Sequence, residues 1–479
     1  MLLGCSKLSY ADPALLRPLA AAAGQAAGRM NEQELANSLY ALGVLGCVGP
    51  AYAPAVEDLV SEVQQRLQRQ PGRFKPQGLS NILYALSLLQ PACGHYWGAV
   101  VELLAAECKR RGFAGFNAQD LSNSAWALEK LGYRSDQGWF TAAVAAAAHP
   151  DIMRMFTAQG LSNLWLALAR ARHRPVAALL EGTIDVSEVL RTHSNGQDCA
   201  NLLWSLATLG APYDQRLARL VDVLVKRLWE LLPEAGKVNN QNLTSSLWAL
   251  AVMGPHALSH YRHLVEQLLH EVVRRWIVTE AVAASHGGPF DPEGLTQLWQ
   301  VQQELAHADG CSGLAGILAA AGGGDSQQPG SLLSAMQRAA AVEGGVADGA
   351  MSDLQRQVVS ALGRLQRQQQ LPAGVPSIAS VSEEQQVEGL VGRVDVVVEL
   401  PGGRRVAVEV DGPWHFLAND PHTRARDGST QLRDRHLGRY FGAGNVVSVP
   451  YWEWGQLGRD KARQERYLLR LLGLKEGER

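Results

Sequence analysis

Three carboxylates toward the C-terminal end have the types and spacing of a site that could cleave phosphodiesters with a metal ion. Asp395 lies in the β-branched run Arg393–Leu400, and Glu409 and Asp411 lie in and just after a second run, Arg404–Val410. Side chains alternate along a strand, so Glu409 and Asp411 share a face, with Asp395 on the adjacent strand. Carboxylate oxygens bind Mg²⁺, which assists in-line attack at phosphate. These residues are the candidate catalytic set, and Asp395 and Glu409 are its candidate metal ligands.

A cluster of basic residues follows the carboxylates. Residues 391–479 contain 15 Lys and Arg against 12 Asp and Glu, and five of the arginines fall within 16 residues: Arg424, Arg426, Arg433, Arg435 and Arg439. The forked donors of arginine suit phosphate oxygens, which makes these side chains candidate phosphate contacts. A solvated loop is the alternative interpretation.

The composition of the whole chain limits the possible functions. With 479 residues and 47% hydrophobic residues, the chain can bury the cores of more than one domain. A formal net charge of −2 excludes a strongly basic surface overall, so nucleic-acid binding must depend on local features. The six scattered cysteines have no metal-type spacing and are expected to be reduced thiols in an intracellular compartment. No apolar run has the length of a membrane helix, so membrane insertion is not expected.

An internal repeat organises the first 300 residues. Six segments of ten residues share a pattern that begins with Gln and continues through Leu, Asn and an aromatic residue to Ala-Leu, and a degenerate seventh copy begins at Glu293. The third position of the pattern is occupied by Leu35, Leu79, Leu121, Leu161, Cys199, Leu243 and Leu295, at steps of 38 to 52 residues. This period suits a repeat made of two helices.

Each copy carries the residues that start a helix. Two positions before the Gln or Glu stand Asn31, Lys75, Asn117, Thr157, Asn195, Asn239 and Asp291. All but the lysine are good N-cap residues, whose side-chain oxygen accepts a hydrogen bond from a backbone N–H. Glu34, Asp120 and Asp198 stand where a capping box places an acid, and Pro76 and Pro292 occupy the first helical position.

The apolar pattern predicts that these helices lie between neighbours. Counted from the cap, positions +4, +8 and +11 are apolar, and +9 and +10 add an aromatic residue and an alanine, which exceeds a single stripe. Amphipathic segments between the copies supply second helices, including residues 55–69, 96–111, 215–232 and 261–276. The fold predicted is a mainly α-helical solenoid of two-helix repeats, about 38–44 residues each.

Position +6 is Asn in five copies and could be structural or functional. The Asn either forms a hydrogen bond that ties neighbouring helices together or presents its amide to a ligand. The aromatic residue at +9 is expected mainly in the core. The residue type at position +7 varies between copies while the flanking positions stay similar, as expected of repeats that each recognise one unit of a ligand. The candidate ligand-binding residues are Asn37, Ser38, Asn81, Ile82, Asn123, Ser124, Asn163, Leu164, Asn201, Leu202 and Ser246.

With this pattern the array, at about residues 28–306, resembles the octotricopeptide repeat, whose helix reads roughly Pro-Gln-Asp-Leu-Ala-Asn-x-Leu-Trp-Ala-Leu. The stretch Lys75–Asn81 is close to it, whereas the first, sixth and seventh copies depart most, with Ser245 replacing Asn in the sixth. The resemblance implies that single-stranded RNA binds along the array at about one base per repeat. It also implies a role in chloroplast or mitochondrial gene expression of the green-algal type.

A different composition begins after the array. Residues 307–352 are predicted to be a low-complexity linker, with residues 320–330 rich in Ala, Gly, Gln and Ser. Residues 353–370 have helical periodicity, and the two β-branched runs are joined by Pro401-Gly402-Gly403, which predicts a hairpin. A third apolar run covers residues 445–450, and an amphipathic helix is predicted over residues 458–472.

Residues 353–474 resemble the RAP domain. The residues that carry the resemblance are Val394-Asp395, Glu409–Pro413 with His415-Phe416, Leu432-Arg433 with Arg435–Leu437, and Val449–Tyr451 followed by Trp454. The resemblance implies a small α/β fold like that of restriction endonucleases and a role in organellar RNA metabolism. The related nucleases place a lysine two residues after the Glu, where this chain has Asp411; His415, Arg433 or His436 are the possible replacements.

The sequence therefore predicts a sequence-specific single-stranded RNA-binding protein acting in organellar RNA processing, stability, splicing or translation, with other RNA-processing proteins as possible partners. The alternatives are an Mg²⁺-dependent RNA endonuclease guided by the solenoid, and a protein-binding scaffold. No cofactor is expected unless the nuclease alternative holds. Localisation to a chloroplast or mitochondrion rests on the resemblance, since Met1–Ala23 does not have the composition of a clear transit peptide.

Overall fold

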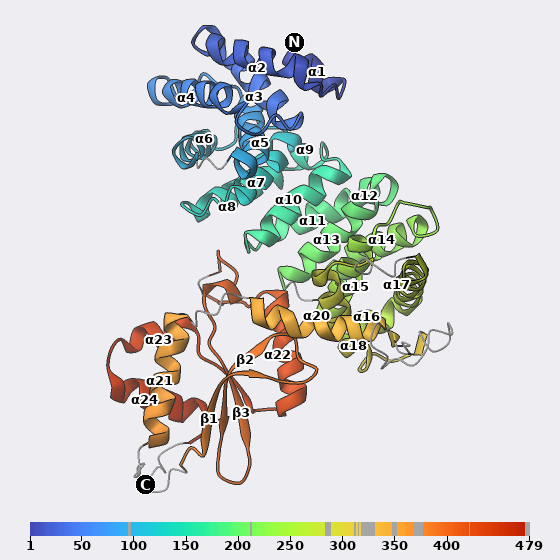
Figure 1. The fold of residues 1–479 in the computed structure, drawn as a ribbon, viewed down its shortest axis with the longest axis vertical. Coiled ribbons are helices and arrows are strands. Elements are labelled where there is room, and N and C mark those ends of the chain that lie inside the picture. The colour runs from blue at the N-terminus through green and yellow to red at the C-terminus, as the bar shows by residue number, and fades with distance from the viewer. Residues whose placement is uncertain are drawn as a thin grey trace. The chain divides into compact units, whose positions relative to one another are not determined.

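The computed structural model describes residues 1–93, 97–210, 213–282, 289–310, 313–314, 316–317, 331–346, 352–367, 377–420 and 422–474. The chain divides into two compact units (Figure 1). The first comprises Met1–Leu206 and Asp214–Lys237, and the second comprises Ala207–Tyr213 and Val238–Arg479. The predicted architecture is confirmed: a mainly helical region precedes a small mixed sheet with helices.

The first unit is helical in its described residues. Its helices are α1 (Leu2–Lys7), α2 (Pro13–Ala26), η1 (Ala27–Arg29), α3 (Glu32–Val44), α4 (Ala53–Arg69), α5 (Pro76–Cys93), α6 (Gly98–Arg110), α7 (Ala118–Lys130), α8 (Gln137–Ala147), α9 (Pro150–Met153), α10 (Ala158–Arg170), α11 (Ala177–Asp185), α12 (Ser187–His193), most of α13 (Gly196–Thr208) and α14 (Gln215–Leu231).

The predicted caps start the helices of the repeat motif. Asn31 accepts a hydrogen bond from Glu34 N at 2.9 Å, and the Glu34 carboxylate accepts one from Asn31 N at 2.8 Å, completing a capping box. Asn117 and Asn195 form the same reciprocal pair with the acid three residues later. Because each cap satisfies backbone donors locally, the helix starts follow from the sequence alone.

These helices pack in two layers. One layer is formed by the motif helices, in which α3 contacts α5, α5 contacts α7 and α7 contacts α10. The other layer is formed by the second helices, in which α2, α4, α6 and α8 contact one another in succession and α11 contacts both α8 and α14. The apolar positions at +4, +8 and +11 face the interior; for example, Leu79, Leu83 and Leu86 are completely buried. This arrangement is the expected two-helix repeat.

The second unit combines further helices with the sheet. Its helices are α15 (Asn240–Met253), α16 (Pro255–His260), α17 (Arg262–Val282), α18 (Pro292–Leu305), α20 (Leu332–Val346), α21 (Asp353–Arg367), η2 (Pro413–His415), α22 (Gly428–Phe441), α23 (Tyr451–Leu457) and α24 (Lys461–Leu471). The last two motif helices, α15 and α18, therefore belong to the same compact unit as the sheet. Within this unit α15 contacts both α18 and α22, so the units divide the chain at a different place from the predicted linker.

The sheet has four strands in the order β1-β2-β3-β4. These are β1 (Ser380–Gln386), β2 (Arg393–Glu399), β3 (Arg405–Glu409) and β4 (Val446–Ser448). The first three strands are antiparallel, and β4 pairs parallel to β3, with α22 connecting them. The predicted hairpin joins β2 to β3, where Gly402 and Gly403 have φ of 88° and 81°, a backbone conformation that favours glycine.

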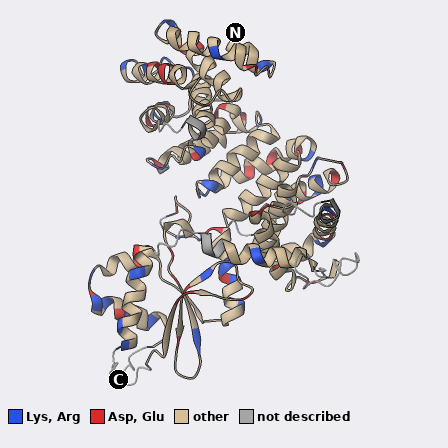
Figure 2. Cartoon of the chain, viewed as in Figure 1, with Lys and Arg blue, Asp and Glu red and all other residues tan. Residues whose placement is uncertain are grey.

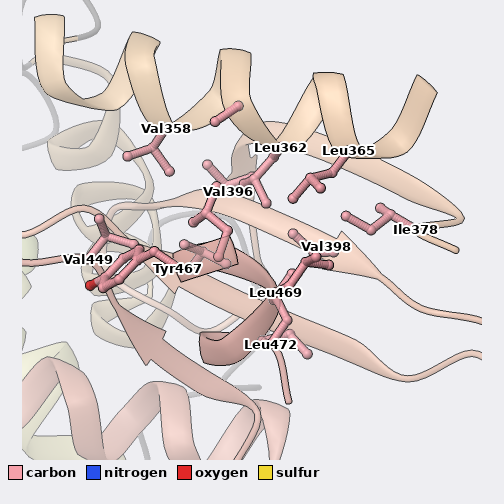
Figure 3. Packing of buried hydrophobic residues seen from close by; sticks show 14 of the residues in the cluster. Val358, Leu362, Leu365, Ile378, Val396, Val398, Val449, Tyr467, Leu469 and Leu472 are labelled. Carbon is pink, nitrogen blue, oxygen red and sulfur yellow. The ribbon is translucent and has the colours of Figure 1, made fainter. Parts of the chain in front are cut away.

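Apolar residues cover both faces of the sheet. On one face, Val396 and Val398 pack with Val358 and Leu362 of α21 and with Leu469 of α24 (Figure 3). On the other face, Val397 and Ala407 pack with Leu437 and Phe441 of α22. These two cores hold the ends of β2 and β3, where the candidate catalytic residues lie.

Several elements were not predicted from the sequence, among them strand β1 and helices α20 and α22. Strand β1 was not predicted, because its sequence Ser-Val-Ser-Glu-Glu-Gln-Gln is mostly polar and it lies at the edge of the sheet. Helix α20 lies within the segment predicted as a linker and packs on α18, with Leu332 and Met336 buried. The Ala/Gly/Gln/Ser-rich stretch 320–330 lies outside the described residues.

Two further observations concern the described part of the chain. None of its helices is long and apolar enough to cross a membrane. Four of its cysteines are free thiols, and Cys47, Cys108 and Cys199 are buried.

Candidate nucleic-acid interface

The motif helices of the first unit present one repeated polar and aromatic face. Positions +2, +6 and +9 follow helical spacing and therefore lie on one side of each helix. The Gln at +2 is exposed in every copy, the Asn at +6 is half-buried, and the aromatic residues at +9 of α3, α5, α7 and α13 are half-buried. We call these positions the exposed stripe. It includes Gln33, Asn37, Tyr40, Gln77, Asn81, Tyr84, Gln119, Asn123, Trp126, Gln159, Asn163, Gln197, Asn201 and Trp204.

The amides at +6 form no hydrogen bonds between neighbouring helices in the described part of the chain. Among the hydrogen bonds of the described residues, none involves the side chain of Asn37, Asn81, Asn123, Asn163 or Asn201. A side-chain amide carries two donors and one acceptor oxygen, which is the capacity needed to recognise a base edge. The structure therefore favours the interpretation in which these amides face a ligand over the one in which they tie helices together.

The aromatic residues at +9 form a row across neighbouring helices. The ring centroids of Tyr40 and Tyr84 are 6.0 Å apart, and those of Tyr84 and Trp126 are 5.4 Å apart. The Lys130 ammonium lies 4.8 Å from the centroid of the Trp126 ring. These rings were expected mainly in the core, but each remains partly exposed. Trp248 in the sixth copy is 6% exposed and does fit that expectation.

The +7 positions lie in the interior, in contrast to the expectation that they line the ligand face. Ile82, Leu164 and Leu202 are completely buried, and so are Ser124 and Ser246. Only Ser38 is partly exposed, and its hydroxyl lies 3.9 Å from the sulfur of Met30. The reason is rotational: the next residue on a helix turns by about 100°, which carries +7 away from the stripe into the contact between motif helices.

Charged residues are sparse on the motif helices. Helix α5 has none, and α10 and α13 have one each, whereas α4 and α14 carry several (Figure 2). The exposed stripe is therefore rich in amides and rings rather than in cations. Such a surface suits contacts to bases more than contacts to phosphates.

In the second unit, Asp395 and Glu409 lie side by side at the ends of β2 and β3. The backbone N–H of Asp395 donates to Glu409 Oε1 at 3.4 Å, and Val410 N donates to Asp395 Oδ2 at 2.7 Å. Arg433 of α22 donates from Nε to Glu409 Oε2 at 2.6 Å. Arg433 therefore supplies the cation beside Glu409 that the sequence lacks two residues after it.

The local environment changes the acidity of Asp395. Burial raises the pKa of the Asp395 carboxyl, and the neighbouring charge of Glu409 raises it further, to about 7. The hydrogen bond from Val410 N and the charge of Arg433 act in the opposite direction. A carboxyl that titrates near neutral pH can bind or release a proton under physiological conditions.

Asp411 has separate partners. Its Oδ2 accepts a hydrogen bond from Arg426 Nη2 at 2.9 Å and another from the Ser448 hydroxyl, and His415 Nδ1 lies 3.5 Å from Oδ1. Within the described ranges, no group of three or more His, Cys, Asp or Glu side chains has the arrangement of a metal site. The structure thus brings Asp395 and Glu409 together and engages Asp411 with Arg426, which differs from the expected set of three.

The predicted arginine cluster is mostly helical rather than a loop. Arg433, Arg435 and Arg439 lie on α22, and Arg439 donates to both oxygens of Glu304 at 2.7 and 3.2 Å. Arg435 donates to the carbonyl oxygens of Ala251 and Val252 at the end of α15, at 2.8 and 3.0 Å. Arg426 pairs with Asp411 and Asp434.

Arg424 differs from the other four arginines. Its guanidinium lies 4.1 Å from the ring centroid of Trp452. Four of the five predicted phosphate contacts are thus engaged in hydrogen bonds or ion pairs within the second unit, and Arg424 stacks on an aromatic ring.

Two features of the site were missed by sequence reasoning. The Gln at +2 recurs in six copies, so its recurrence could have identified it as part of the exposed face. Glu304 could not have been identified, because its partners on α22 are more than a hundred residues away in the sequence.

Comparison with known proteins adds one family. A search of curated proteins found no match to the chain. Residues 408–471, which span β3 to α24, match the family model of the RAP domain. This match confirms the resemblance for that part of the chain and suggests an RNA-binding role. The protein therefore carries a RAP domain in its C-terminal region.

Proposed function

We propose that this protein binds single-stranded RNA in a sequence-specific manner along the exposed stripe of its motif helices. The repeats are octotricopeptide-like, and each Asn at +6 contacts about one base. The protein acts in the processing, stability, splicing or translation of a transcript in a chloroplast or mitochondrion. The RAP domain match supports RNA as the ligand, and the organellar setting rests on the resemblance of the repeats.

The observation that carries the proposal is the row of amides at +6. Asn81, Asn123 and Asn163 lie at the same position of successive motif helices, and within the described residues none of their side chains is hydrogen-bonded to the protein. A partly buried amide without an internal partner is costly unless water or a ligand satisfies it. Its regular recurrence supports an extended ligand with a repeating chemical unit.

The aromatic row supports a single-stranded ligand. Unpaired bases stack on aromatic rings, and such stacking tolerates any base. The rings of Tyr40, Tyr84 and Trp126 lie one helical turn from the amides, so a base could be stacked and read at the same repeat. Double-stranded nucleic acid would not expose its base faces to these rings.

A randomised single-stranded RNA selection with the purified full chain tests the proposal. We expect a preferred sequence, and about tenfold weaker binding after Asn123→Ala, since a lost bidentate contact costs roughly 1–3 kcal/mol. The matched control is Gln68→Ala, an exposed amide on α4 in the second layer. If no RNA is preferred and the chain instead retains a protein, the scaffold alternative is supported.

The arrangement of Asp395 and Glu409 favours one second candidate, an RNA endonuclease guided by the helical repeats. Together the two carboxylates could hold Mg²⁺, which would polarise the phosphate and activate water, and Arg433 would stabilise charge beside Glu409. Mg²⁺-dependent cleavage of the selected RNA that is lost in Asp395→Ala and Glu409→Ala would support this candidate. Binding without cleavage of any selected RNA would contradict it.

A further inference from the structure

A group of aromatic side chains lies where β3 and β4 end. The Phe416 ring is buried, and the ring centroid of Trp452 lies 4.4 Å from it. The ring centroids of Tyr451 and Trp452 are 5.1 Å apart, and Tyr451 is 38% exposed. We call Arg424, Tyr451 and Trp452 the aromatic cluster.

Backbone hydrogen bonds fix the segments that carry this cluster. Tyr451 N donates to Asp411 O at 2.9 Å, which ties the start of α23 to the end of β3. Asp427 N donates to His415 O at 3.1 Å, and Leu417 N donates to Ala425 O at 2.8 Å, closing the loop between β3 and α22 on itself. The rings are therefore presented by a constrained loop, which lowers the entropy lost when a ligand binds.

Arg424, which lies over the Trp452 ring, has an unusual backbone conformation. Its φ is 49°, in the left-handed region that non-glycine residues rarely adopt. The neighbouring turn is fixed by Asp420, whose carbonyl accepts from Arg424 N at 3.0 Å and whose carboxylate accepts from Thr423 N at 3.1 Å. Strained backbone that is kept in place by local hydrogen bonds is typical of functional positions.

The Arg424 guanidinium has no carboxylate partner among the described residues and can therefore pair with a charged ligand. The other four arginines of the basic cluster bond to carboxylates or carbonyl oxygens, as described above, but in the described part of the chain no carboxylate lies within ion-pair distance of Arg424. The guanidinium over the Trp452 ring carries N–H donors that can also bind oxygen atoms of a ligand.

We propose that the aromatic cluster is a nucleotide-binding site of the RAP domain, in which an unpaired RNA base stacks on an exposed ring and Arg424 binds the adjacent phosphate. The inference rests on the proposed RNA-binding function and assigns a second contact to it, separate from the exposed stripe. An apolar protein surface fits less well, because it would bury the Arg424 charge without a counter-charge. The site takes any base, since stacking does not depend on base identity.

The test uses the full chain and the selected single-stranded RNA. Ultraviolet crosslinking followed by peptide mapping should locate crosslinks in residues 412–426 or 451–457. Tyr451→Ala should weaken binding about tenfold, in keeping with the loss of one stacked base, and Tyr451→Phe, which keeps the ring, should largely preserve it. Arg424→Ala should reduce the dependence of log K on log salt by about 0.7. Tyr440→Ala is the control, since Tyr440 is 49% exposed on α22 outside the cluster.

The outcomes separate the two proposals. Unchanged affinity in Tyr451→Ala and Arg424→Ala, with no crosslink in these peptides, overturns the nucleotide site, while loss of binding in Asn123→Ala still supports the exposed stripe. Loss of binding in Tyr451→Ala with no effect of Asn123→Ala supports the nucleotide site and contradicts the exposed stripe. If the full chain binds no RNA, both are wrong.

Discussion

Glu304, near the end of α18, and His436 of α22 form a buried pair, with Glu304 Oε1 2.9 Å from His436 Nε2. Arg439 donates to both carboxylate oxygens, and Arg435 Nε lies 3.7 Å from Oε1. One acid of the last motif helix thus satisfies three cationic or polar side chains of the RAP domain. This contact explains why α18 and the sheet belong to one compact unit.

Replacing Glu304 with Gln should destabilise the second unit. The variant leaves the partly buried charges of Arg435 and Arg439 without a counter-charge, and breaking a buried ion pair costs about 3 kcal/mol. Hydrogen exchange of the α22 amides should speed up accordingly. Glu293→Gln, an exposed change at the start of the same helix, is the control and should leave the exchange rates unchanged.

The same pair predicts that acid destabilises the second unit. Burial raises the pKa of Glu304, but hydrogen bonds from His436 and Arg439 and the charge of Arg435 outweigh this and lower it to about 2 from the ordinary 4.5. Burial also lowers the pKa of His436, so the unfolded chain takes up a proton more readily at this position. In both cases the unfolded state binds more protons in acid, so the free energy of unfolding falls as pH decreases.

Unfolding measured across the acid range checks this sign. The contribution of His436 to the free energy of unfolding should begin to disappear below pH 6.5. The contribution of Glu304 should disappear between pH 4.5 and 2. Glu304→Gln should lack the second part of the pH dependence. A wild-type protein whose second unit is equally stable throughout this range would contradict the assignment.

The sequence predicts those parts of the fold that depend on local chemistry. Asn31 and Asn117 start their helices through residues three positions away, and the Gly402-Gly403 turn joins strands that are adjacent in the sequence. Strand β1 could not be predicted, because a polar edge strand exists only by pairing with β2. Helix α22 was not predicted, because its many charged residues leave too few apolar positions, such as Leu432 and Leu437, to show a helical period.

The candidate site was predictable in part for the same reason. The pairing of Asp395 with Glu409 follows from two adjacent strands, and the stripe at +6 follows from helical spacing. The burial of Ile82 and Leu164 depends on the rotation of each helix against its neighbour, which a repeated motif does not fix. The roles of Arg435 and Arg439 depend on Glu304, which only the tertiary structure brings near them.

Removing a cap should weaken one repeat without altering its exposed face. Asn117→Ala removes the side chain that accepts from Asp120 N at 2.8 Å and should cost about 1 kcal/mol of stability. Hydrogen exchange of amides in the first turn of α7 should detect the change. Asn117→Asp should preserve the cap and serve as the matched control, and equal exchange in the Ala variant would contradict the role of the cap.

Asp395→Asn should change how the stability of the second unit depends on pH. Because burial and the charge of Glu409 raise the pKa of Asp395 from 3.8 to about 7, the folded state holds its proton more tightly, and the wild type loses stability as pH rises through this window. The Asn variant lacks that loss, so its stability relative to wild type should increase by about 1–3 kcal/mol between acidic and mildly alkaline pH. Denaturant unfolding at both pH values measures the difference.

The control for this change is Asp353→Asn at the exposed start of α21. It removes a carboxylate from the same unit without removing a buried charge. If Asp353→Asn and Asp395→Asn alter the pH dependence equally, the proximity of Asp395 and Glu409 does not determine the acidity of Asp395.

Binding of RNA to the exposed stripe should depend only weakly on salt. The motif helices carry few cations, and Lys130 at the end of α7, 4.8 Å from the Trp126 ring centroid, is the side chain there best placed to meet a phosphate next to a stacked base. Each phosphate contact to a single strand adds about 0.7 to the slope of log K against log salt. Lys130→Ala should therefore lower the slope by about that amount.

The control is Lys109→Ala on α6 in the second layer. The Lys109 ammonium pairs with Asp136 at 2.5 Å, so this substitution should leave the slope unchanged. A steep slope that neither substitution alters would mean that the RNA is held by phosphate contacts elsewhere, contrary to a stripe that reads bases.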